Sequence, residues 1–178
     1  MPIIASDIKK RYSVAAAAGD TTVGTAATSL GDQISTTDIA DDTFGNFFPD
    51  VTGDESAAGV IKYRGIFILN NHATLTLQNA VVSISGQIAN GSTVAIAVDG
   101  TAISAKGSAS LQMVTIANEN TAPAGASAFG LGPIALGNLA PGQVKGVWIR
   151  QTTPAGATSP APEGTDDFDL AIDGDTLP

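Results

Sequence analysis

The sequence predicts an all-β protein, built as an antiparallel sandwich of two sheets. Short apolar segments with period-two alternation recur between turn-forming residues, which is the pattern of strands in two packed sheets. Helical periodicity is limited to one turn near the N-terminus. The 178 residues are 43% hydrophobic but only 5% aromatic, so we expect a single core built mainly from aliphatic side chains.

The longest alternating segment, residues 60–71, is expected to be the central strand. One parity of this segment carries apolar side chains: Ile61, Tyr63, Phe67 and Leu69. The other parity carries polar side chains: Lys62, Arg64 and Asn70. Such alternation predicts a strand with one buried face and one face in water.

The N-terminal segment, residues 1–40, is expected to be an extended arm, followed by a sandwich domain over residues 41–178. Residues 6–12 are compatible with a single helical turn that Ser6 or Asp7 would cap. Residues 15–39 are small and polar, with widely spaced apolar side chains, so they have little to bury. A loosely packed terminus is one interpretation, and an arm that orders against a neighbouring subunit is the favoured one.

Further strands follow along the chain. Residues 80–85, 93–98, 111–116 and 168–172 alternate or are apolar. Val82 has the opposite parity to Leu77, so residues 78–79 should hold a bulge or turn that changes the buried face. Tight-turn dipeptides at 90–91 and 99–100 predict an antiparallel meander through this region.

The strand around Trp148 is expected to be apolar on both faces. It follows residues 134–137 and the Pro141-Gly142 turn, which is of a kind common where a chain crosses between the sheets of immunoglobulin-like sandwiches. Both an immunoglobulin-like and a jelly-roll topology fit. The residues expected in the sandwich interior are Ile61, Tyr63, Phe67, Leu69, Val82, Ile84, Ile96, Trp148, Leu170 and Ile172.

Composition excludes several classes of function. Seventeen acidic residues against eight basic ones give a net charge of -9, which argues against binding the phosphate backbone of nucleic acid. No apolar run approaches the roughly 20 residues of a membrane span. The first residues lack a signal peptide's charged start and apolar stretch, so we expect a soluble product made without export.

No catalytic constellation is visible in the sequence. The single histidine, His72, has no Gly-x-Ser-x-Gly motif beside it, and one histidine without any cysteine excludes the usual zinc sites. Two acidic stretches, with Asp50, Asp54 and Glu55 in one and Asp173 and Asp175 in the other, could hold a cation; a solvated acidic turn is the favoured interpretation of the first. We therefore expect neither enzymatic activity nor a cofactor.

Candidate partner-binding residues lie in two places. The apolar and basic side chains near the N-terminus could lie across a partner, and the phenylalanine-rich loop 44–48 must pack on the sheet beside it or on a partner surface. These candidates are Ile3, Ile4, Ile8, Lys9, Lys10, Arg11, Tyr12, Phe44, Phe47 and Phe48.

Several passages resemble the small virion structural proteins of tailed bacteriophages: residues 6–12 (SDIKKRY), 50–59 (DVTGDESAAG), 70–75 (NNHATL), 138–143 (NLAPGQ) and 147–150 (VWIR). The resemblance implies a homo-oligomeric or lattice-bound virion component, assembled in the host cytoplasm. Its partners would be the major capsid protein or other virion proteins, with this chain as a capsid decoration (cement) protein. Alternatives are a neck, tail or baseplate protein, or a secreted carbohydrate-binding or adhesin sandwich.

Overall fold

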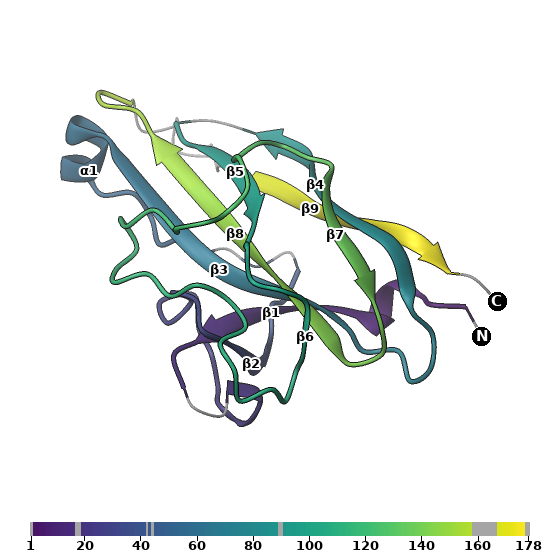
Figure 1. Cartoon of the computed structure of the whole chain (residues 1–178). Coiled ribbons are helices and arrows are strands. Elements are labelled where there is room, and N and C mark those ends of the chain that lie inside the picture. Colours follow the sequence, from purple (N-terminus) through teal and green to yellow (C-terminus); the bar gives the residue numbers. More distant parts are fainter. Residues whose placement is uncertain are drawn as a thin grey trace.

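The protein is a two-layer β-sandwich in a computed structural model that describes residues 2–16, 19–41, 43, 45–88, 91–157 and 167–176. The larger sheet contains six strands: β1 (Ile8–Val14), β2 (Gln33–Asp38), β3 (Val60–Asn70), β5 (Thr93–Val98), β6 (Ser104–Ala105) and β8 (Gln143–Thr153). The smaller sheet contains three: β4 (Leu77–Ile88), β7 (Ile134–Leu139) and β9 (Asp167–Thr176). All pairs are antiparallel, which confirms the predicted fold class (Figure 1).

The described part of the chain has little helix. Its helices are the 3-10 turns η1 (Ala5–Asp7) and η2 (Gly19–Thr21) and the α-helix α1 (Gly53–Ala58). None of these is long and apolar enough to cross a membrane. The short α1 lies where the sequence predicts an acidic turn, and a capping box formed by Thr52 and Glu55 starts it.

The strands do not form a meander. In the larger sheet the order is β2-β1-β3-β8-β5, with β6 also on β8, and in the smaller sheet it is β7-β4-β9. The expectation of a meander through residues 80–104 is wrong because β4 and β5 lie in different sheets. The turn after β7 does cross between sheets, as its sequence predicts, since β8 lies in the larger one. Residues 111–116, expected as a strand, form only an isolated bridge between Asp32 and Met113.

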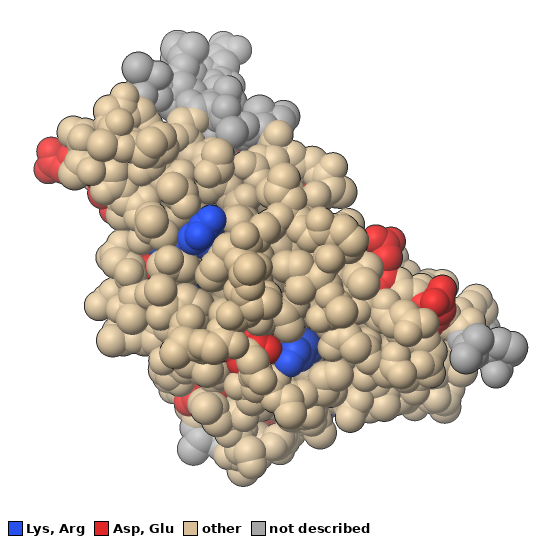
Figure 2. Space-filling model, turned by 45° about the horizontal axis from the view of Figure 1, so that its top comes forward, with Lys and Arg blue, Asp and Glu red and all other residues tan. Residues whose placement is uncertain are grey.

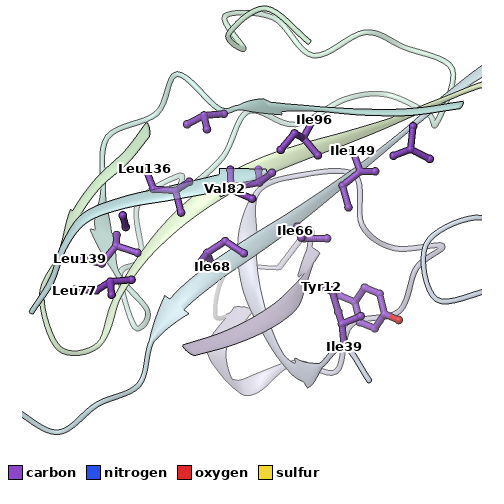
Figure 3. Packing of buried hydrophobic residues seen from close by; sticks show 14 residues of the cluster. Tyr12, Ile39, Ile66, Ile68, Leu77, Val82, Ile96, Leu136, Leu139 and Ile149 are labelled. Carbon is purple, nitrogen blue, oxygen red and sulfur yellow. The ribbon is translucent and has the colours of Figure 1, made fainter. Parts of the chain in front are cut away.

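The main core lies between the two sheets. The larger sheet contributes Ile66 and Ile68 from β3 and Ile149 from β8, and these pack against side chains of β4 and β7 that include Val82 and Leu139 (Figure 3). The side chains are aliphatic, as the composition predicts. The bulge expected at residues 78–79 is present as a shift in the register of β4 between Leu77 and Ala80.

Six residues of the predicted interior are buried, but only Val82 and Ile96 lie in the main core between the sheets. The other four lie in a second core on the other face of the larger sheet: Tyr63, Phe67, Leu69 and Trp148. Three more are partly buried and pack against the main core: Ile84, Leu170 and Ile172. Ile61 is the error, because its side chain is 42% exposed near the beginning of β3.

Both faces of β3 are buried, which contradicts the prediction of a wet face. Lys62, Arg64 and Asn70 are only 3%, 4% and 0% exposed. The opposite parity, with Phe67 and Leu69, belongs to a second core on the outer face of the larger sheet. Loop residues such as Met113, Ile116 and Phe129 cover that core, so the second face is covered by loops instead of by a third sheet.

The outer core requires small residues on the sheet. A Cβ atom at Gly65 would lie 2.7 Å from the Sδ of Met113 and 3.2 Å from Cζ3 of Trp148, and one at Gly146 would lie 3.0 Å from the Cε of Met113. These glycines therefore make room for the side chains of Met113 and Trp148 in the outer core.

The N-terminal segment is extended, but it lies within the chain's own sheet. β1 pairs with β3 from Ile8 opposite Asn70 to Tyr12 opposite Ile66, and β2 pairs with β1. The expected boundary at residue 40 therefore does not separate an arm from the sheet. The helical turn expected over residues 6–12 is confined to η1, because residues from Ile8 onward make strand pairs with β3.

We expect a large loss of stability for Phe67→Ala. The ring is fully buried, so its removal should lower the free energy of unfolding by about 3–5 kcal/mol. Ile61→Ala on the same strand removes an exposed side chain and should cost less than about 1 kcal/mol. Urea unfolding of both variants measures the difference, and equal losses would contradict the burial pattern of β3.

We also expect that residues 2–14 cannot be removed without unfolding the sandwich. Their deletion takes away β1, leaves one edge of β3 unpaired over residues 66–70 and removes the buried Tyr12 and Val14. Circular dichroism during heating should show no cooperative transition for this shortened chain. A chain lacking only residues 2–4 is the control and should retain one. An unchanged melting temperature after the longer deletion would show that the segment is an independent arm.

Candidate functional site

A network of buried charges lies at the beginning of β3. Lys62 Nζ is 2.7 Å from Glu55 Oε1 and 3.7 Å from Glu119 Oε1. Arg64 donates from its guanidinium to the second carboxylate oxygen of Glu119. Both cations are almost fully buried, whereas the two glutamates are about 30% exposed. The four charges cancel, which offsets the desolvation cost of the cations.

Helix α1 positions Glu55 for this network. Thr52 Oγ1 accepts the amide N–H of Glu55 at 3.2 Å, and Glu55 Oε2 accepts the amide N–H of Thr52 at 3.0 Å. The remaining carboxylate oxygen is then free to bind Lys62, and this bond holds the pKa of Glu55 below its usual value. In the described part of the chain, no group of three or more histidine, cysteine, aspartate or glutamate side chains is placed to hold a metal ion.

The phenylalanine loop packs on its own sandwich. Arg64 Nε donates to the carbonyl oxygen of Phe47 at 3.2 Å, and its guanidinium carbon lies 5.7 Å from the centre of the Phe48 ring. The Phe47 ring lies 5.3 Å from the Phe168 ring on β9, centre to centre. The sheet is therefore one packing surface for this loop, as the sequence allowed, and Phe44 lies outside the described residues.

The N-terminal candidates make contacts within the chain. Arg11 Nε lies 2.6 Å from Asp38 Oδ1, Lys9 Nζ lies 3.8 Å from Asp38 Oδ2, and Lys10 pairs with Asp41. Tyr12 is buried and donates its hydroxyl to the carbonyl of Asn46 at 2.9 Å. Ile3 and Ile8 pack against the main core, whereas Ile4 is 58% exposed. These N-terminal residues lie close together, but most of them contact other residues of the same chain.

His72 occupies the turn after β3. Its Nδ1 accepts the amide N–H groups of Thr74 at 3.1 Å and Leu75 at 3.0 Å, and its own amide donates to Asn70 Oδ1 at 3.0 Å. The imidazole therefore caps the turn that follows β3.

Asp99 is a buried anion that the sequence analysis missed. It is 1% exposed, and its Oδ2 accepts the indole N–H of Trp148 at 2.8 Å and the amide of Val114 at 3.2 Å. Nearby, burial lowers the pKa of Lys145, and the charge of Asp99 opposes that shift. The Asp99-Gly100 dipeptide indicated only a turn, and nothing local in the sequence pointed to a buried partner almost 50 residues away.

A charge-poor part of the surface is the loop layer, which we define as residues 101–133. Its residues up to Phe129 cover the outer core, whereas Gly130 and Leu131 bond to Ile96 and Ile84. The layer contains two charged residues in 33 positions, Lys106 and Glu119, against 14% charge for the whole chain. In the described part of the chain five large hydrophobic side chains are exposed, and two of them, Leu111 at 51% and Leu131 at 54%, lie in this layer. In the view of Figure 2, charged side chains are few and scattered. Depletion of charge around exposed apolar side chains is typical of the centre of protein interfaces.

The buried polar groups described above hold loops on the sheet, and the loop layer presents a surface with little charge to solvent. This arrangement is suited to contact with another macromolecule. Comparisons of the chain with protein-family models, with curated proteins and with solved structures found no match.

We expect the Glu55–Lys62 bond to make stability depend on pH. Because the folded pKa of Glu55 is lowered, the bond stabilises the native state above the unfolded-state pKa of about 4.3 and is lost as pH falls through the folded value. The urea midpoint of the native chain should therefore fall more between pH 6 and pH 3 than that of Glu55→Gln. Asp54→Asn, which alters an exposed carboxylate of the same turn, should behave like the native chain. Parallel pH profiles for all three proteins would contradict the assignment.

Proposed function

We propose that this chain is a non-enzymatic structural protein of a tailed-bacteriophage virion, and that it decorates and stabilises the lattice of the major capsid protein. The observation that carries the proposal is the loop layer. This layer is poor in charge and exposes two leucines, and most of it lies on a sheet that is packed on both faces. Such a surface is suited to lie against another protein over a wide area.

The use of the ionisable side chains supports a role without catalysis. His72 caps a turn with the nitrogen that a catalytic base would need, and Lys62 and Arg64 neutralise two glutamates. Asp99 accepts three hydrogen bonds from Thr101, Val114 and Trp148. A nucleophile or general base needs an accessible lone pair beside a substrate. The lone pairs of His72 Nδ1 and of Asp99 accept N–H groups of the protein, and protonated lysine and arginine have none.

The resemblance of several sequence passages to phage virion proteins supports the choice of partner. A decoration protein gains from a fold that stays rigid while many copies bind one lattice. Copies with a net charge of -9 repel one another in solution, so the lattice, and not direct self-attraction, would set their spacing. A protein of the neck, tail or baseplate would need the same kind of surface. The number of copies per particle distinguishes such a protein from one that covers the capsid.

The experiment is to purify virus particles from cells that produce this chain and to measure its copy number. A decoration protein should sediment with full particles in numbers that match the capsid lattice, and its removal should lower the temperature at which the particles release their genome. A few copies per particle would assign it to the neck, tail or baseplate. Absence from particles, together with binding on a glycan array, would favour the secreted carbohydrate-binding alternative.

We expect Leu131→Asp to weaken particle binding without unfolding the chain. The side chain is 54% exposed, so the melting temperature should change little, whereas a carboxylate buried within the proposed contact should reduce co-sedimentation at least tenfold. Val23→Asp is the control, since Val23 is 71% exposed but lies outside the loop layer. Equal binding by both variants would show that another surface makes the contact.

A further inference from the structure

One end of the outer face of the larger sheet is not covered by the loop layer. There β3, β8 and β5 lie side by side, and the strand register places two rows of side chains on this face. Arg150 and Ala95 share the parity of Trp148 and Ala97, which belong to the outer core, so they point to the same side. We call the exposed and partly exposed side chains of the two rows the outer-face patch: Ile61, Thr93, Ala95, Arg150 and Thr152.

Arg150 is the charged residue of this patch. Its guanidinium carbon lies 4.8 Å from the centre of the Phe129 ring, and that ring lies 5.6 Å from the Tyr63 ring, centre to centre. Its Nε is buried and has no hydrogen-bond acceptor among the described residues. The terminal nitrogens have no acceptor there either, but they are not buried. The aromatic contact thus holds the guanidinium in place while its terminal N–H groups can be reached from outside.

No carboxylate of the described residues compensates the charge of Arg150. Its cross-strand neighbours are Tyr63 on β3 and Ala95 on β5. Lys145 donates to the carbonyl oxygen of Thr101, and five other basic residues form ion pairs within the chain: Lys9, Lys10, Arg11, Lys62 and Arg64. A partly buried cation without an anion has lost hydration and gained no compensating charge. An anion from outside the chain would supply that compensation.

The surroundings of Arg150 favour a carboxylate on a protein over a polyanion. The described patch holds one guanidinium, whereas a phosphate backbone is bound by several cations, and the net charge of -9 opposes a polyanion as a whole. A planar guanidinium can bind both oxygens of one carboxylate. Ile61, which is 42% exposed, offers an apolar contact to the residues that flank such a carboxylate. Because salt screens exposed charges beyond about 8 Å, the local cation decides the contact.

We propose that the outer-face patch binds an acidic segment of a different protein. A glutamate or aspartate carboxylate of the segment accepts hydrogen bonds from the terminal nitrogens of Arg150, and an apolar side chain beside it packs against Ile61. A second copy of this chain is the weaker candidate, because copies of equal charge repel one another. The inference rests on the proposed function only for the partner being a virion protein.

The test uses two acetylated and amidated pentapeptides, VEVEV and VQVQV, titrated into the isotopically labelled full chain and followed by NMR. VEVEV should shift the Nε–H signal of Arg150 and the backbone signals of Ala95 and Thr152 together, with saturation in the millimolar range. VQVQV has a similar shape without the charge and should leave these signals unchanged. Inorganic phosphate is the third probe, and binding of phosphate tighter than that of VEVEV would overturn the choice of a carboxylate.

A matched pair of variants tests the role of Arg150. Arg150→Gln should weaken binding of VEVEV about three- to tenfold, the loss expected for a partly exposed, charged hydrogen bond. Lys106→Gln removes the same charge from an exposed side chain of the loop layer and should leave the binding unchanged. Arg150→Lys keeps the charge but lacks the planar fork, so it should also bind more weakly, and it replaces Arg150→Gln if that variant does not fold.

Four further results would overturn the proposal: no saturable shift with VEVEV, equal shifts with VQVQV, equal binding by the native chain and the Arg150 variants, or a dimer in sedimentation velocity that Arg150→Gln abolishes. The last result would place a second copy on the patch. The peptide titration is independent of particle sedimentation. A failed titration with bound particles would therefore reject the patch and leave the proposed function standing.

Discussion

The burial of β3 on both faces determines where the other elements lie. Every residue from Lys62 to Asn70 is buried, so each face needs a covering layer and each polar group needs a partner. The smaller sheet covers one face and loops cover the other. Asn70 shows how strictly the second condition is met: its amide nitrogen donates to Leu75 at 2.8 Å and Leu139 at 2.7 Å, and its oxygen accepts from His72. One buried side chain thereby fixes both the turn after β3 and the end of β7.

The two buried cations organise the opposite end of the strand in the same way. Lys62 holds Glu55 and with it α1, whereas Arg64 holds Glu119 and the backbone of Phe47. Apolar residues of similar size would avoid the desolvation cost, and they are often no less stabilising than a buried ion pair. Apolar residues would not fix the position of a partner, whereas a planar guanidinium donates hydrogen bonds only to acceptors that lie in defined directions. We infer that these charges select the positions of three loops more than they add to stability.

This dependence on distant partners explains which parts of the structure the sequence predicts. Local alternation is sufficient for β3, β5, β8 and β9 and for the bulge at residues 78–79, because period and turn chemistry are local properties. The alternation pattern wrongly predicted that one face of β3 lies in water. The ion-pair partner of Arg64, Glu119, is more than 50 residues away, and no local signal connects the two residues. The segment 8–14 was assigned to an arm for a related reason. Its basic side chains were expected to lie across a partner, but Asp38 and Asp41 of the same chain pair with them. The surface features were missed entirely, because exposure of Leu131 and burial of Gln151 depend on which loops cover which face.

The unequal size of the sheets leaves a cleft of about 480 Å³ between them. Three strands cannot cover the inner face of six, so the loop that carries Phe47 and Phe48 fills part of the uncovered area. Where that loop meets β9 the filling is incomplete, and Gln151 lies at this place. One larger apolar side chain at position 151 would close the gap, since close packing and satisfied polar groups both favour it.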